Sequence, residues 1–196
     1  MKEENNKRNN VLFLVLLGLI ILFHFVNNIS YLSLDTRPPA WDESWHTAIS
    51  FSYYNQLTGN EMSLNKFTPA TYERSTWYPH LVHYSAVPFY ALLGVHEDVA
   101  AFTITFYLAI LIIFTYLIGK LLYNPKVGLV AALIVSLYQI VFGTSRLFLL
   151  DLPVTAFVVM TFYFIFRYLE TKKNIDLCFI VLSTILGFFL ILSAKI

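Results

Sequence analysis

Long apolar runs separated by short polar segments dominate the pattern of this 196-residue chain. An α-helix needs about 17 to 25 mainly apolar residues to cross the hydrocarbon core of a bilayer. Five runs have that length, and they extend over about 11–31, 99–123, 127–143, 151–169 and 177–196. The pattern therefore predicts an all-α, polytopic membrane protein with about five transmembrane helices.

The longest polar stretch, residues 32–98, forms one large loop between the first two spans. It contains "PPAWDESWHTAISFSYY" (38–54), where two prolines end any earlier helix and Asp42 stands where it can cap a new one. Asp42, Trp45, His46 and Tyr53 then recur at spacings of three and four residues or their sums, so they share one face of an interfacial helix. Residues 80–94 are apolar but short, which predicts a second interfacial or re-entrant helix.

Composition agrees with a membrane protein, because 58% of the residues are hydrophobic and only 13% are charged. The net charge of +1 implies no attraction to nucleic acid. The basic start followed by an apolar run resembles a signal peptide, but no small-x-small cleavage site follows, so we expect an uncleaved first helix. Asn28-Ile29-Ser30 matches a glycosylation sequon, but it lies too close to the bilayer to serve as one.

The basic residues predict the orientation of the spans. If every span crosses the bilayer, three basic groups fall on one side, and the positive-inside rule makes that side cytoplasmic. The groups are Lys2, Lys7 and Arg8; Lys120 and Lys126; and Arg167, Lys172 and Lys173. The loop 32–98 and the segment "TSRLFLLDLP" (144–153) then share the outer face. We expect an integral protein of a prokaryotic plasma membrane, with a cytoplasmic N-terminus and the first loop outside.

Two acidic sites on this outer face are candidates for chemistry. Asp42 and Asp151 each stand at the start of a predicted helix, so each is also explained as an N-cap. Arg146 and Asp151 bracket "LFLL" at membrane depth or at its surface, where ionisable side chains usually serve a function.

Three histidines of the loop 32–98 are candidate metal ligands. His80 and His83 are one helical turn apart in "HLVH", and His46 lies on the Asp42 face. With Asp42 they are a candidate ligand set for a divalent metal, although the spacing alone is a weak signal and is more typical of interfacial histidines.

The order of these motifs resembles the GT-C membrane glycosyltransferases, in the group of protein O-mannosyltransferases and aminoarabinose transferases (glycosyltransferase families 39 and 83). The group's first-loop Asp-Glu pair is matched by Asp42-Glu43. Its basic-Pro-Pro-Leu element reads "YPHL" (78–81) here, so Tyr78 replaces the basic residue and His80 replaces a proline.

Two later motifs of the group also have counterparts. Its Ser-Arg-x-x-x-x-Asp stretch is matched by Ser145, Arg146 and Asp151, and its Thr-Lys-Gly element corresponds to Lys195 in "AKI". Members of the group usually have more spans. We therefore expect residues 1–196 to form a single membrane domain that is the N-terminal part of a GT-C-like module, lacking part of the donor pocket if the chain is truncated.

The resemblance implies transfer of a sugar from a polyprenyl-phosphate donor to a hydroxyl or amine of a protein, lipid or glycan acceptor, with inversion. Asp42 is then the general base, with Glu43 raising its pKa, and Asp151 positions the acceptor or orients Arg146. Arg146, Lys195 and His80 would bind the donor phosphate. The expected substrate-lining residues are Trp45, His46, Tyr53, Trp77, Tyr78 and His83. No metal is required, since a lipid monophosphate is already a fair leaving group.

Two other classes of protein stay open from the sequence. Membrane carboxylates such as Asp151 also serve as relays in transporters and channels, although the charges here gather at the outer surface and not at mid-span. A non-catalytic membrane partner that docks through its outer loop is the third reading.

Overall fold

The computed structural model describes the backbone of residues 2–59 and 80–191, and the side chains of residues 11–59 and 81–188. Within these ranges every element is helical. The helices are α1 (Lys2–Leu34), α2 (Trp41–Thr58), α4 (His80–Leu93), α5 (Glu97–Leu122), α6 (Pro125–Leu137), α7 (Gln139–Thr144), α8 (Asp151–Thr171) and α9 (Asn174–Ile191). Trp77, Tyr78 and Lys195 lie outside the described residues, as does the side chain of His80.

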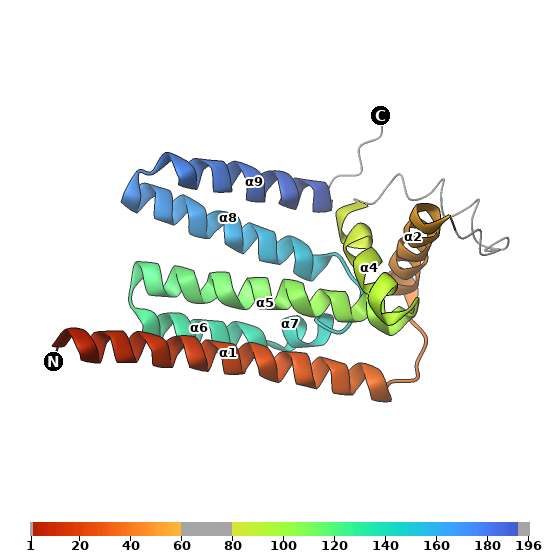
Figure 1. The fold of residues 1–196 in the computed structure, drawn as a ribbon, viewed down its shortest axis with the longest axis horizontal. Helices are drawn as coiled ribbons and strands as arrows, with labels where there is room; N and C mark the ends of the chain where they lie inside the picture. The colour runs from red at the N-terminus through yellow and green to blue at the C-terminus, as the bar shows by residue number, and fades with distance from the viewer. Residues whose placement is uncertain (1, 60–79, 192–196) are drawn as a thin grey trace.

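The bundle is formed by helices that run side by side along the long axis of the molecule, α1, α5, α6, α8 and α9, and α2 and α4 lie across one end of it (Figure 1). Helix α5 occupies the centre and packs against α1, α4, α6 and α8. Its residues Ile104, Leu108 and Ile112 are completely buried, at the i, i+4 spacing of one helix face. The all-helical architecture confirms the predicted fold class.

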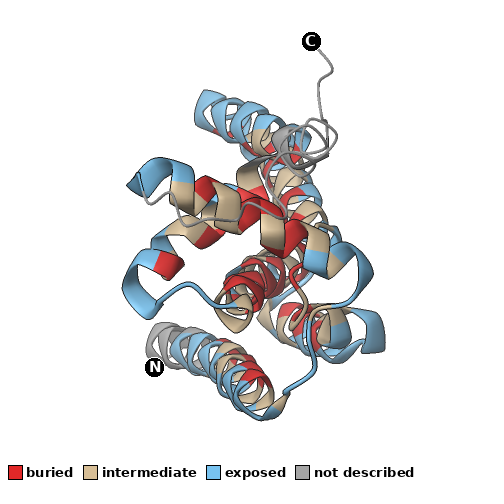
Figure 2. Cartoon of the chain, turned by 90° about the vertical axis from the view of Figure 1, so that its right-hand side faces the viewer, coloured by how far each residue is buried: buried red, intermediate tan, exposed pale blue. Residues whose placement is uncertain are grey.

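The outer surface of the bundle is apolar. Viewed from the end that carries α2 and α4, buried residues gather at the centre, and the helices turn exposed sides outward (Figure 2). On α1, for example, Leu14, Leu19 and Phe23 are each more than half exposed. Such an exposed apolar band suits contact with lipid, because lipid tails and aliphatic side chains have similar polarity.

Three of the described helices are long and apolar enough to cross a membrane, namely Val11–Leu34, Glu97–Leu122 and Asp151–Thr171. The apolar helices at Pro125–Leu137 and Asn174–Phe188 are shorter. The predicted continuous third span over 127–143 is wrong, because Tyr138 is extended (φ −61°, ψ 129°) and divides it into α6 and α7. Only Ser136 and Gln139 interrupt the apolar run around this break, so the hydrophobic pattern gives little sign of it.

The predicted N-caps at Asp42 and Asp151 are also wrong. Helix α2 begins at Trp41, and Ala40 occupies the capping position without a side-chain hydrogen bond. Helix α8 begins at Asp151 itself, after Leu150. Both carboxylates therefore lie in the first helical turn, where the partial positive charge of the helix start favours them but leaves their oxygens available for other partners.

The ends of the bundle differ in charge. The start of α1, the α5–α6 turn and the α8–α9 turn all lie at the end opposite α2 and α4 (Figure 1). This places all three basic groups at one end, as the sequence predicts for alternating spans. Which compartment that end faces stays a prediction.

Helices α5 and α6 form a tight hairpin. Asn124 caps α6 by accepting hydrogen bonds from the backbone N–H groups of Lys126 (3.0 Å) and Val127 (3.1 Å). Just beyond the turn, Gly119 and Gly128 face each other so closely that a Cβ atom on Gly128 would lie 2.4 Å from the carbonyl oxygen of Tyr116. Small residues at such a crossing allow two backbones to approach in a membrane.

We expect Gly128→Ala to destabilise the hairpin by about 1–3 kcal/mol, because the added methyl group has to push backbone apart. Thermal unfolding of the purified protein in detergent measures the effect. Gly143→Ala is the matched control, since nothing lies within 4 Å of a Cβ atom built there. Equal melting temperatures for the two variants would show that the hairpin tolerates a wider spacing.

Candidate active site

A cleft of about 420 Å³ opens at the end of the bundle that carries α2. Its walls come from the end of α1 and the chain that follows it, the start of α2, the start of α5, and the α7–α8 loop. Its charged lining residues are Asp35, Arg37, Asp42, Glu43, Glu97, Asp98 and Arg146. Segments more than 100 residues apart in sequence thus contribute charge to one cavity.

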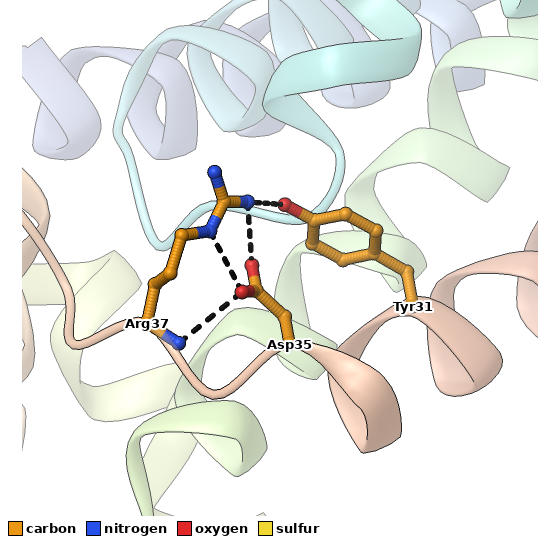
Figure 3. A network of polar contacts seen from close by, with 3 residues as sticks. All are labelled: Tyr31, Asp35 and Arg37. Carbon is orange, nitrogen blue, oxygen red and sulfur yellow. Dashed lines mark hydrogen bonds and ion pairs between the residues drawn. The ribbon is translucent and has the colours of Figure 1, made fainter.

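One rim of the cleft is a compact polar cluster of Tyr31, Asp35 and Arg37 (Figure 3). Arg37 donates from Nε to Asp35 Oδ1 (2.8 Å) and from Nη2 to both Asp35 Oδ2 (2.8 Å) and the Tyr31 hydroxyl (2.5 Å). The hydrogen bonds from Arg37, followed by that from Tyr31, hold the pKa of Asp35 well below its usual range. Asp35 and Arg37 therefore neutralise each other and brace the chain as it leaves the membrane.

Arg146 forms the cationic wall of the cleft. Its guanidinium carbon lies 4.6 Å from the centre of the Tyr31 ring and 4.1 Å from that of Phe142, so two aromatic rings hold the group. Burial lowers the pKa of Arg146 from its ordinary value, while Tyr31 acts in the opposite direction. Its buried Nε has no hydrogen-bond partner among the described residues. Arg146 lines the cleft and forms no ion pair among the described residues, so its charge is not neutralised by a neighbouring carboxylate.

The loop that carries Arg146 is attached to α2 by Glu43. The Glu43 carboxylate accepts a hydrogen bond from the backbone N–H of Phe148 through Oε1 (3.1 Å), across 105 positions of sequence. Phe148 itself is completely buried. Burial raises the pKa of Glu43, and the hydrogen bond from Phe148 opposes that rise. Glu43 thus has a structural role that the sequence pattern does not reveal.

The two aspartates predicted to act in catalysis occupy different places. Asp42 is exposed and lines the cleft, whereas Asp151 is exposed at the start of α8 and does not line it. Both are nevertheless close enough to act on His46: burial lowers the pKa of His46, and the charges of Asp42 and Asp151 oppose this change. The fold therefore brings the two sites to the same region of the molecule.

None of the predicted substrate-lining residues whose side chains the structure describes lines the cleft. His46, Tyr53 and His83 are buried between α2 and α4, and Trp45 is half-buried on α2. His46 Nδ1 is 3.0 Å from His83 Nε2, so one ring donates to the other. Tyr53 stacks on Tyr84 with ring centres 4.3 Å apart. These contacts bind α2 to α4.

A metal site receives no support from the described residues. Among them, no group of three or more His, Cys, Asp or Glu side chains is arranged to hold an ion. His46 pairs with His83, whereas Asp42 lines the cleft.

Trp41 is a lining residue that the sequence analysis missed. It is 92% exposed and has a left-handed backbone (φ 49°), which is rare for a bulky side chain. Glu97 and Asp98 were missed as well, although both stand in the first turn of α5. Asp98 pairs with His96 at 3.0 Å. For Glu97 and Asp98 the available signal was their position at the start of a membrane helix on the predicted outer face.

Comparison with known proteins gives one match. The family model for dolichyl-phosphate-mannose-protein mannosyltransferase matches residues 78–191, which is more than half of the chain. The chain belongs to this family. No curated protein and no solved structure matches it. The protein is thus a membrane glycosyltransferase of the GT-C type, and the match contains Arg146 and Asp151 but begins after Asp42 and Glu43.

We expect Glu43→Ala to lower stability by about 1–3 kcal/mol, because the Phe148 N–H then loses its acceptor inside the protein. Glu43→Gln keeps an acceptor oxygen at the same place and is the matched control. Melting temperatures in detergent compare the two variants. Equal losses would show that the charge of Glu43, and not its hydrogen bond, holds the loop.

The raised pKa of Glu43 also predicts a pH dependence. Burial favours the protonated Glu43 carboxyl in the folded state. The stability that this protonated form contributes is therefore lost as pH rises from 4.5, the ordinary pKa of a glutamate, through the raised pKa. Glu43→Gln does not ionise. Its melting temperature relative to the parent protein should therefore increase across this pH window, and a constant difference would contradict the assigned pKa shift.

Proposed function

We propose that this glycosyltransferase moves a sugar from a polyprenyl-phosphate donor to an acceptor nucleophile in the cleft at the α2 end of the bundle. The observation that carries the proposal is that Asp42 and Arg146 line the same cavity. A base for the acceptor and a cation for the departing phosphate are the two groups such a transfer needs.

The position of the cleft suits a lipid-linked donor. It lies beside the ends of membrane helices whose outer faces are apolar, so the polyprenyl tail can stay in the bilayer while the phosphate reaches Arg146. The exposed Trp41 at the cleft wall offers a flat surface to a sugar ring. The family match supports such a donor and a protein or glycan acceptor in general terms.

The reaction that we propose is a single inverting displacement. The acceptor oxygen, or nitrogen, attacks the anomeric carbon as the bond between that carbon and the phosphate oxygen breaks. The proton of the acceptor passes to the Asp42 carboxylate, and the bonding electrons leave with the phosphate. Arg146 stabilises the negative charge that grows on the phosphate, and its fixed place between two rings lowers the cost of orienting it.

Other predicted residues have secondary roles in this proposal. Glu43 holds the Arg146 loop in place, and Asp151 positions the acceptor from outside the cleft. Lys195 and His80 remain predicted phosphate ligands. The reaction needs no metal, because a guanidinium already neutralises the leaving phosphate. The α2 end faces outward and the basic end faces the cytoplasm, following the positive-inside rule.

We expect Asp42→Asn to reduce sugar transfer about 10²- to 10⁴-fold, the usual contribution of a positioned general base. The assay measures transfer of label from polyprenyl-phosphate mannose in membranes that contain the protein. Asp98→Asn is the matched control, because Asp98 lines the same cleft but is paired with His96. Near-normal transfer by Asp42→Asn would reject the general-base assignment.

Substitution of Arg146 tests the phosphate site. Arg146→Gln should lower kcat/KM for the donor about 10²- to 10³-fold, since an electrostatic donor to the leaving group is lost. Arg146→Lys keeps the charge but not the planar group that packs between two rings, and should recover only part of this loss. Unchanged kinetics in Arg146→Gln would place the donor phosphate elsewhere.

A further inference from the structure

A buried amide in the first membrane helix makes long-range contacts that the proposed mechanism does not yet use. Asn28 on α1 is completely buried, and so are Thr105 on α5 and Ser145 at the end of α7. Asn28 Nδ2 donates to Thr105 Oγ1 (3.1 Å), to Ser145 Oγ (3.1 Å) and to the Ser145 backbone carbonyl (3.2 Å). One side chain thus links three segments that are up to 117 positions apart in sequence.

The contacts converge on the residue that precedes Arg146. Ser145 is held at its carbonyl and its hydroxyl by Asn28, and its hydroxyl also contacts the Phe142 carbonyl (2.8 Å). The peptide that joins Ser145 to Arg146 is therefore fixed directly. A buried amide held by several hydrogen bonds is stiff, because losing any of them leaves a polar group unsatisfied away from water.

Helix α1 also contacts the guanidinium group of Arg146. Tyr31 lies three residues after Asn28, on a neighbouring part of the same helix face, and its ring packs on the guanidinium at 4.6 Å. Asn28 thus sets the backbone of Arg146, and Tyr31 sets the plane of its guanidinium. The same burial excludes Asn28 as a glycosylation site in this fold.

We propose that Asn28 is a positioning residue for Arg146, holding the 145–146 peptide so that the guanidinium faces the donor phosphate. The inference rests on the proposed phosphate-binding role of Arg146. A purely structural amide would stabilise the bundle without affecting catalysis. A positioning amide also affects donor kinetics, because misplacing a catalytic group by about 1 Å costs up to about 10²-fold in rate.

Asn28→Leu tests this, since leucine has a similar volume but no hydrogen-bonding group. We expect kcat/KM for polyprenyl-phosphate mannose to fall about 10- to 100-fold in the folded protein. Thr105→Val is the matched control: it removes one buried hydrogen bond of Asn28 without touching Ser145, and should leave kcat/KM close to the parent value while lowering the melting temperature. Ser145→Ala, which keeps the carbonyl contact, should show a smaller kinetic loss and serves if Asn28→Leu does not fold.

The decisive measurement combines Asn28→Leu, or Ser145→Ala if Asn28→Leu does not fold, with Arg146→Gln. If Asn28 acts through Arg146, its substitution has little further effect on donor kinetics once the guanidinium is gone, so the two losses are not additive. Additive losses, or a kinetic effect of Thr105→Val as large as that of Asn28→Leu, would overturn the positioning role and leave the phosphate role of Arg146 intact. Unchanged kinetics in Arg146→Gln alone would instead overturn the phosphate role, and the positioning role with it.

Discussion

The α7–α8 loop is held on two sides by long-range hydrogen bonds, and the cleft depends on this attachment. Asn28, which also donates to Thr105 on α5, holds the beginning of the loop from within the bundle, and Glu43 accepts from the Phe148 N–H on the side of α2. Away from water, an irregular segment persists only when its polar groups find partners in the protein. Each partner here comes from a distant part of the chain, so the loop and its Arg146 take shape only when α1, α2 and α5 are assembled.

Charge in the cleft is distributed in two ways. Asp35 and Arg37 neutralise each other at the rim and brace the exit of α1. Arg146 has aromatic neighbours in place of a carboxylate, and Asp42 is exposed on the wall. A guanidinium packed between rings keeps its charge available to a ligand, whereas one in a bidentate ion pair is already occupied. This difference distinguishes the proposed phosphate site from the ion pair at the rim of the cleft.

Sequence reasoning succeeded where a local signal exists. Apolar runs predict the membrane helices, the run of spacings after "PPA" predicts α2, and the order of "DE", "YPHL" and "SRLFLLD" resembles the family that the comparison then confirmed. It failed at Tyr138, where the backbone breaks within a run that is still mainly apolar, and at Asp42 and Asp151, which enter the first helical turn instead of capping it. Asn28 looked only like an unusable sequon, since nothing local reveals a partner 117 positions away.

The amino-acid sequence by itself determined the class of this protein, most of its helices, and the gathering of three basic groups at one end of the bundle. Those properties follow from local hydrophobicity and charge, which every segment carries alone. The tertiary structure decided which polar side chains share a cavity. His46 and Tyr53 turned toward α4, Glu43 became an anchor, and Arg146 came to face the cleft that Asp42 lines. Packing decides such choices, because burial penalises an unpaired polar group and the available partners depend on how the helices meet.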